Sequence, residues 1–142
     1  MTLPPDIAAR FSTVRIPDCA RTLGIEVLSF DPKTNEVTVA AQGRNEFRNP
    51  MGAIQGGFLC AMLDDVMALA AVFTGNFEFV VPTLEMKVSF YAPAEPGTIK
   101  GVGRVAKMGK SIAFLEGELY AADGKPLAKA SATARLAPMP KA

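Results

Sequence analysis

One long apolar run constrains the fold of this chain more than any other feature. From Phe58 to Phe73 every residue is apolar except two, and Gly75 follows as a natural helix stop. The run has few β-branched residues and is longer than strands usually are, so it predicts a helix over residues 55–74. It is short for a membrane span, and an Asp at a bilayer centre costs about 2.5–3.5 kcal/mol. We therefore expect the buried central helix of the fold.

The two exceptions in the run are neighbouring acids, Asp64 and Asp65. Adjacent helical residues point about 100° apart, so the two carboxylates cannot share one environment. An unpaired buried carboxylate is costly, so each should be protonated, hydrogen-bonded or part of a site. A structural acid that caps a neighbouring loop is the alternative explanation for either residue.

The composition indicates an ordinary globular protein. The chain has 142 residues, 49% hydrophobic and 20% charged, and predicts one domain over residues 1–142. The net charge is +1 and no basic cluster is present, so we expect no nucleic-acid partner. The first residues lack an apolar signal core, and no other stretch is long enough to span a membrane. These features predict a cytoplasmic protein without a membrane partner.

The absence of histidine restricts the chemistry most strongly. The chain contains no His and only two Cys, Cys19 and Cys60. This excludes Ser-His-Asp and Cys-His machinery, His-based zinc sites and any His general base. We therefore expect no metal and no cofactor. Any reaction must use carboxylates, hydroxyls, amides, lysines or backbone groups.

The segments around the helix predict a curved antiparallel sheet. A helical N-terminal segment over about 4–23 comprises a short helix (4–14) and a helical turn (18–23). The expected strands are 25–30, 36–41, 82–91, 98–106, 111–121 and 127–136. Short turns make neighbouring strands antiparallel, and a helix that is apolar all round needs a sheet that curls around it. The fold class is thus α+β, with one sheet wrapped on one long helix.

Two of the expected strands carry more specific information. Over 82–91 the alternation places Leu84 and Met86 on one face, and Thr83 and Glu85 on the other. The last strand has only small residues on one side, which would let a helix or another subunit approach closely. These residues are Ala128, Ala130, Ala132 and Ala134. The tail from Pro138 is expected to be loose.

The start of the central helix supplies a second ingredient of a site. Gly56 and Gly57 present backbone N–H groups where a helix leaves donors unsatisfied, and such donors can polarise a carbonyl oxygen. The alternative interpretation is that the two glycines only allow a loop to pack tightly against the sheet. Gly56 and Asp64 lie about 12 Å apart along the helix, at 1.5 Å per residue. If both serve one reaction, they must come from two antiparallel helices, which implies a symmetric dimer with two composite sites.

These residues carry a family resemblance. The pattern Asn49-x5-Gln55-Gly56-Gly57, with Asp64 on the helix and Thr83 on the strand beyond, resembles the hotdog-fold acyl-CoA thioesterases of the PaaI type. The resemblance covers nearly the whole domain. It implies a homodimer, often paired into a tetramer, that hydrolyses acyl- or aryl-CoA without metal. It also implies that Asn49, Gly56 and Asp64 carry the site, with Thr83 where the family often has Ser or Thr.

The chain departs from this family at Gln55, where these enzymes commonly have His. An amide can hydrogen-bond a carbonyl oxygen, but it does not titrate near neutrality. The departure concerns the rate and the substrate class rather than the fold. It also disfavours hotdog hydratases and dehydratases, which depend on a catalytic His.

The hypothesis is then a thioesterase with a site shared between subunits. The Gly56 N–H, with Gln55 assisting, would polarise the thioester carbonyl, and Asp64 of the other subunit would act as general base or as nucleophile. Asn49 and Thr83 would position the water or the carboxylate. The expected substrate contacts are Gly57, Phe58, Arg104, Lys107 and Lys110. The expected acyl-pocket walls are Phe58, Met62, Phe73 and Phe90, each of which is otherwise ordinary core.

Two other classes of function compete with this hypothesis. A non-catalytic acyl-CoA or small-ligand binding protein on the same fold is favoured by Gln55 and disfavoured by Asp64. A structural dimerisation module would have no affinity for thioesters. The sequence does not identify the acyl group.

Overall fold

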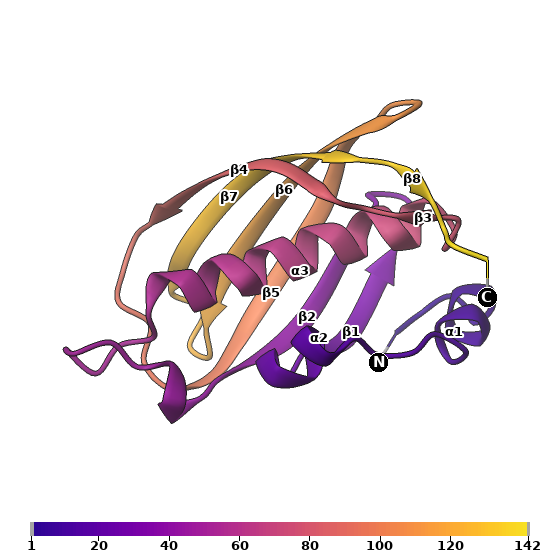
Figure 1. Ribbon diagram of the computed structural model, residues 1–142. Helices are drawn as coiled ribbons and strands as arrows, with labels where there is room; N and C mark the ends of the chain where they lie inside the picture. Colours follow the sequence, from indigo (N-terminus) through magenta and orange to yellow (C-terminus); the bar gives the residue numbers. More distant parts are fainter. Residues whose placement is uncertain (1, 142) are drawn as a thin grey trace.

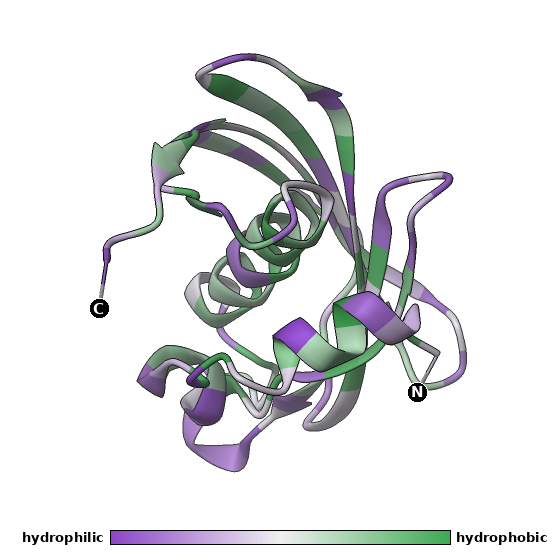
Figure 2. Ribbon diagram, turned by 90° about the vertical axis from the view of Figure 1, so that its right-hand side faces the viewer, coloured by the Kyte–Doolittle hydropathy of each residue, from purple (hydrophilic) through white to green (hydrophobic). Residues whose placement is uncertain are grey.

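The central element of the structure is helix α3 (Gly56–Thr74), within one residue of the range predicted for the apolar run. The structure is a computed structural model that describes residues 2–141. Around α3 curves a six-stranded antiparallel sheet with the order β1-β2-β5-β6-β7-β4 (Figures 1 and 2). Its strands are β1 (Glu26–Asp31), β2 (Glu36–Gly43), β4 (Thr83–Phe90), β5 (Gly97–Met108), β6 (Ile112–Ala121) and β7 (Pro126–Arg135). The predicted α+β architecture, one sheet wrapped on one helix, is confirmed.

The sheet approaches α3 closely where its inner face carries small residues, above all on β5 and β7. The alanine series of β7 is buried against the helix, as its pattern predicts. On β5, a Cβ on Gly103 would lie 2.3 Å from the carbonyl oxygen of Val66 in α3, so only glycine fits there. The helix contributes its large side chains to this core: Leu59, Met62, Leu63, Val66, Met67 and Phe73. Two of the expected acyl-pocket walls, Met62 and Phe73, are therefore core residues.

The N-terminal segment forms two short helices, α1 (Pro5–Phe11) and α2 (Asp18–Leu23). Helix α1 is shorter than the predicted range 4–14. The hydroxyls of Ser12 and Thr13 donate to carbonyl oxygens three residues earlier, which ends the helix. Helix α2 ends where predicted, at Gly24, whose φ of +63° suits glycine.

Three short elements are not predicted by the sequence patterns. A 3-10 turn, η1 (Asn45–Phe47), precedes the central helix. Strands β3 (Phe79–Val80) and β8 (Ala137–Pro138) pair with each other as a separate two-stranded sheet. The prediction of a loose tail from Pro138 is wrong at its start, because Pro138 pairs with Phe79 and the N–H of Met139 donates to Glu78. Two-residue strands are too short to show a period.

A β-bulge in β4 changes the face to which Thr83 belongs. The alternation predicts Thr83 on the same face as Glu85, but the register with β7 shifts between these two residues. Thr83 lies opposite the fully buried Ala134, on the inner face, whereas Glu85 accepts a hydrogen bond from Thr133 on the outer face. Leu84, within the bulge, is exposed. The predicted alternation is therefore wrong at Thr83, and the bulge is the reason.

The sheet covers one side of α3 and leaves a flank uncovered. Among residues 2–141, α3 is the one helix long and apolar enough to cross a membrane, but it packs inside the sheet as the core helix (Figure 2). On the flank away from the sheet, four helix positions with small or medium-sized residues are exposed or half-buried: Gly57, Ala61, Ala68 and Val72. Asp64 falls on the same flank by helical periodicity. We call these five positions the open flank of α3.

Candidate active site

The N-terminus of α3 has free backbone donors. Gln55 is the N-cap residue, and no side chain caps the helix. The first amide with a partner is that of Phe58, which donates to the carbonyl oxygen of Gln55. Within residues 2–141 the N–H groups of Gly56 and Gly57 have no hydrogen-bond acceptor. A helix start of this kind can bind a carbonyl oxygen or an anion.

Both glycines at this helix start are in close contact with other side chains. The amide of Gln55 folds over Gly57, because its Oε1 lies 2.6 Å from the position that a Cβ on Gly57 would take. A Cβ on Gly56 would lie 3.1 Å from Cζ of Phe90, the last residue of β4. Gln55 is exposed and makes no side-chain cap hydrogen bond. Its amide is therefore close to the free N–H groups without blocking them.

Asn49 organises the loop that leads into the helix. Its side-chain Oδ1 accepts hydrogen bonds from the N–H groups of Met51, at 2.9 Å, and Ala53, at 3.1 Å. Its own N–H donates to the carbonyl of Ala53 at 2.7 Å. The structure thus gives Asn49 a role in shaping the loop before Gly56. Asn49 precedes the helix start, fifteen residues before Asp64, so within one chain the structure does not bring these two residues together.

Asp64 and Thr83 form the second part of the site. The hydroxyl of Thr83 donates to Oδ1 of Asp64 at 2.5 Å. The bulge makes this contact possible, since regular alternation would turn Thr83 to the outer face. Asp64 is half-buried, and no ion pair in residues 2–141 involves it. The carboxylate is held by a neutral donor and keeps its second oxygen available.

Asp65 occupies a different environment on the next position of the helix. Burial, with a smaller contribution from the charge of Asp64, raises its pKa to about 6. Its Oδ2 is buried and has no hydrogen-bond partner among the described residues. The two acids are thus separated, as the 100° rule predicts, with one hydrogen-bonded carboxylate and one desolvated carboxyl group.

The predicted substrate contacts lie in different parts of the molecule. Phe58 stacks on Phe47 with ring centroids 4.0 Å apart, so it holds η1 against α3. Lys107 and Lys110 are exposed near the turn between β5 and β6. That turn lies at the same end of the sheet as Thr83, because Thr83 and Ala113 both pair with Ala134.

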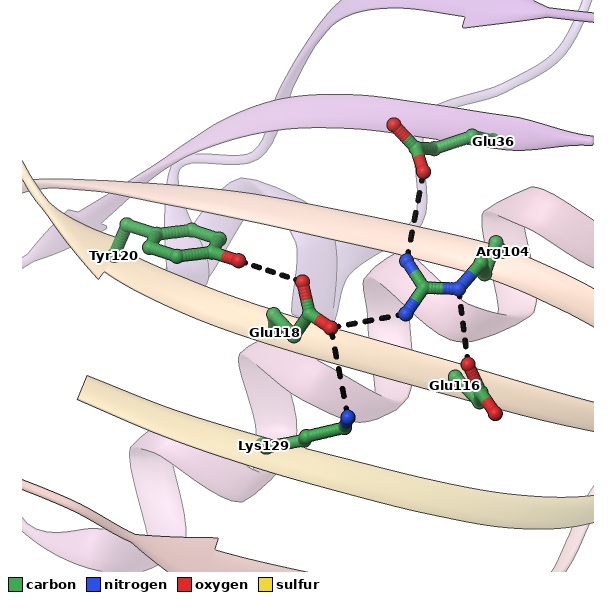
Figure 3. A network of polar contacts seen from close by, with 6 residues as sticks. All are labelled: Glu36, Arg104, Glu116, Glu118, Tyr120 and Lys129. Carbon is green, nitrogen blue, oxygen red and sulfur yellow. Dashed lines mark hydrogen bonds and ion pairs between the residues drawn. The ribbon is translucent and has the colours of Figure 1, made fainter. Parts of the chain in front are cut away.

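Arg104 is already neutralised by carboxylates. It lies on the outer face of the sheet and contacts Glu116 and Glu118 at 2.9 Å and Glu36 at 3.5 Å (Figure 3). Burial by itself would raise the pKa of Glu118, but hydrogen bonds from Tyr120 and Arg104 outweigh it and lower that pKa. The structure gives Arg104 the role of joining β2, β5 and β6 from outside. Its guanidinium is not free for a CoA phosphate.

A cleft opens beside the start of α3, with a volume of about 410 Å³. Its lining combines the Asn49 loop, the first turn of α3 and the end of β4 with the loop that follows. The lining residues are Asn49, Met51, Ala53, Ile54, Gly56, Leu59, Phe90, Tyr91, Ala92, Pro93 and Ala94. Sequence reasoning selected Phe90 but missed Met51 and Tyr91, because isolated exposed apolar residues carry no periodic signal.

The chain resembles known proteins in both sequence and fold. The Thioesterase superfamily matches over residues 51–128. A phenylacetic acid degradation-related protein from Ralstonia eutropha JMP134 has a crystal structure with 32% identity and a TM-score of 0.84, covering 91% of this chain and 98% of that one. PaaI from E. coli is 20% identical, with a TM-score of 0.78 over 92% of this chain and 90% of that one, which indicates a shared fold.

A curated relative gives a shorter match. A protein assigned as an esterase, from Saccharolobus solfataricus, is 33% identical over 87 residues, which are 61% of either chain. The chain thus matches less than two thirds of this relative's length. Together with the family match, these findings show that the chain belongs to the thioesterase superfamily and has the hotdog fold. Within that superfamily it is of the PaaI-like kind, so the predicted resemblance is confirmed.

Proposed function

We propose that the protein hydrolyses an acyl- or aryl-CoA thioester at a site shared between two subunits. Asp64 of one subunit would act as the base, and the Gly56 N–H of the other would bind the carbonyl oxygen. The observation that carries the proposal is the Thr83–Asp64 hydrogen bond on the open flank of α3. It fixes a carboxylate on a surface that is otherwise lined by small residues.

The length of α3 requires the second subunit. Gly56 and Asp64 are about 12 Å apart along the axis at 1.5 Å per residue, too far to act on one carbonyl. A second α3 running antiparallel, with the two-fold axis near Cys60, would place the partner's Asp64 beside Gly56. Gly57 and Ala61, both on the open flank, would allow the two helices to approach closely.

The edge of the sheet supports the same dimer. Strand β4 pairs with β7 on one side and has no strand neighbour on the other within the described chain. Its residues are mostly exposed, including Leu84 and Phe90. Unprotected edge strands tend to pair with another chain. A two-fold axis that brings two α3 helices together would also bring two β4 edges together, and both would then be covered.

The chemistry needs no histidine. Asp64 would remove a proton from a water molecule, whose oxygen attacks the thioester carbonyl carbon. The negative charge on the carbonyl oxygen would be stabilised by the Gly56 N–H and the helix dipole. The C–S bond then breaks, and CoA leaves as a thiolate, because a thiol with a pKa near 8.5 needs little assistance from an acid. Direct attack by Asp64 would instead form an acyl anhydride that water hydrolyses.

Gln55, Lys107 and Lys110 would complete the site. The Gln55 amide, folded over Gly57, is close enough to the helix start to assist the carbonyl oxygen. Lys107 and Lys110 are exposed at the end of the sheet where Thr83 lies, so they are the proposed contacts for the CoA phosphates.

The test is thiol release from a panel of acyl- and aryl-CoA thioesters. Asp64→Asn should lower the rate at least about a hundredfold, whereas the neighbouring Asp65→Asn should stay within a few-fold of wild type. Equal losses in both variants would contradict the assignment of the base. Binding of CoA esters without turnover in the wild type would favour the alternative function, a binding protein.

The shared site has its own test. Asp64→Asn and Gly56→Pro chains, each inactive alone, should regain about a quarter of wild-type activity when mixed and re-associated. Half of the dimers would then be mixed, and each mixed dimer would hold one intact site. Mixtures that stay inactive, although mass spectrometry shows mixed dimers, would contradict a composite site.

A further inference from the structure

The cleft beside the start of α3 has an apolar lining that fits one end of the proposed substrate better than the other. No Lys, Arg, Asp or Glu lines it, and the larger lining side chains include Met51, Ile54, Leu59, Phe90 and Tyr91. The side-chain oxygen of Asn49 is already used within the loop. The phosphates and amides of CoA need charged or polar partners. The cleft therefore suits the acyl group and not the CoA portion.

Phe90 has a special position in this cleft. It lies opposite the buried Ala128, on the inner face of the sheet, and its ring tip is 3.1 Å from the Cβ position of Gly56. The start of α3 and the end of β4 lie at the same end of the molecule (Figure 1). Phe90 is nevertheless 52% exposed, so no other part of the chain covers its outer side. The ring forms a wall beside Gly56, the first residue of α3.

We propose that Phe90 determines which acyl group is accepted, and that the accepted group is compact, either aryl or short-chain. This proposal rests on the proposed hydrolase function. An acyl group whose carbonyl binds the Gly56 N–H must fit between the ring and the Asn49 loop. An apolar cavity of about 150 Å³ is enough for a benzene ring, and the cleft is larger. A long straight chain that continues past Gly56 would collide with the ring of Phe90.

The test compares kcat/KM along a series of acyl-CoA thioesters, from butyryl to dodecanoyl, together with benzoyl-CoA. Phe90→Ala should shift the octanoyl-to-benzoyl ratio toward octanoyl by at least about tenfold, since each methylene that becomes buried is worth about fourfold. Phe90→Trp should shift the ratio in the opposite direction. Phe114→Ala is the matched control, because Phe114 is a half-exposed phenylalanine on the outer face of the sheet. It should leave the ratio unchanged.

The outcomes separate the two proposals. No turnover of any thioester by the wild type overturns the hydrolase function, and the selectivity role with it. Wild-type turnover with an unchanged ratio in both Phe90 variants overturns the selectivity role alone. An equal loss of kcat/KM for every substrate in the series also overturns it, since a structural defect would lower kcat/KM for all substrates equally. Sedimentation of each variant confirms that the oligomeric state is that of the wild type.

Discussion

Two regions of this molecule hold carboxylates in opposite ways. On the outer face of the sheet, Glu36, Glu116 and Glu118 surround Arg104, and Lys129 lies 3.9 Å from Glu118 (Figure 3). On α3, Asp64 has a single neutral donor, and one oxygen of Asp65 has no partner. No cation pairs with either aspartate in the described part of the chain.

The difference indicates what each region is for. Carboxylates that share a guanidinium are neutralised, and their hydrogen bonds to it hold neighbouring strands together. A carboxylate without a cation costs stability, but it keeps its capacity to accept a proton or attack a carbon. The helix tolerates this cost because the packed sheet stabilises it from the other side. The comparison predicts that substitutions on α3 change activity or pH dependence, whereas substitutions on the outer face change only stability.

The largest effect is expected at the helix start. Gly56→Pro removes the proposed N–H donor at the first helical position, where proline is tolerated. Gln55 has a ψ of 138°, which suits a residue before proline. Loss of one such donor should lower kcat by about 10²–10³, or 2.7–4 kcal/mol. The measurement is steady-state thiol release.

The matched control for this change is Gly56→Ala. Alanine adds the same Cβ near Phe90 but keeps the N–H group. A loss in Gly56→Ala as large as that in Gly56→Pro would assign the effect to crowding against Phe90. It would then remove the Gly56 N–H from the proposed mechanism.

The next effect concerns Asp65 and pH. Its pKa of about 6 lies above the ordinary 3.8, so the folded protein binds the Asp65 proton more tightly than the unfolded chain does. The bound proton therefore stabilises the folded state. That stabilisation is complete below pH 3.8 and is lost as the pH rises through 6. Asp65→Asn stays uncharged, so its free energy of unfolding should exceed that of wild type by about 2–3 kcal/mol at pH 8. Near pH 3.5 the two proteins should be equal.

Urea denaturation across this pH range measures the effect, with Glu46→Gln as the control. Glu46 is exposed in η1, so its substitution should give curves parallel to wild type at every pH. A constant difference between Asp65→Asn and wild type at all pH values would show that Asp65 is not desolvated.

The sequence predicted the helix, the six main strands and the curved architecture because these depend on hydrophobic periodicity over many residues. It could not predict the contact between Thr83 and Asp64, because a single bulge residue in β4 moves Thr83 to the other face of the sheet without any change in composition. It also could not show that Arg104 is occupied, since its partners come from β2 and β6. Both differences arise from pairing between strands that are distant in sequence, and local patterns do not encode it.

The next-largest effect is expected at Thr83, whose hydroxyl has a matched counterpart, Thr133, on the outer face of the sheet. Thr83 donates to Asp64 on the inner face, and Thr133 donates to Glu85 on the outer face at 2.9 Å. Thr83→Val should lower kcat about tenfold, because a hydrogen bond to a charged group is worth about 1.5–3 kcal/mol. Thr133→Val should leave thiol release unchanged. Equal effects of the two substitutions would indicate that the Asp64 contact is structural.

The smallest effect is expected for Arg104→Met, which leaves three carboxylates without their shared cation. Because these groups are partly exposed, water screens much of the repulsion, and the free energy of unfolding should fall by only about 1 kcal/mol at low salt. Added salt should reduce the difference, and thiol release should be unaffected. If Arg104 instead binds a CoA phosphate, the substitution raises KM without changing stability, and the contrast between the two regions fails.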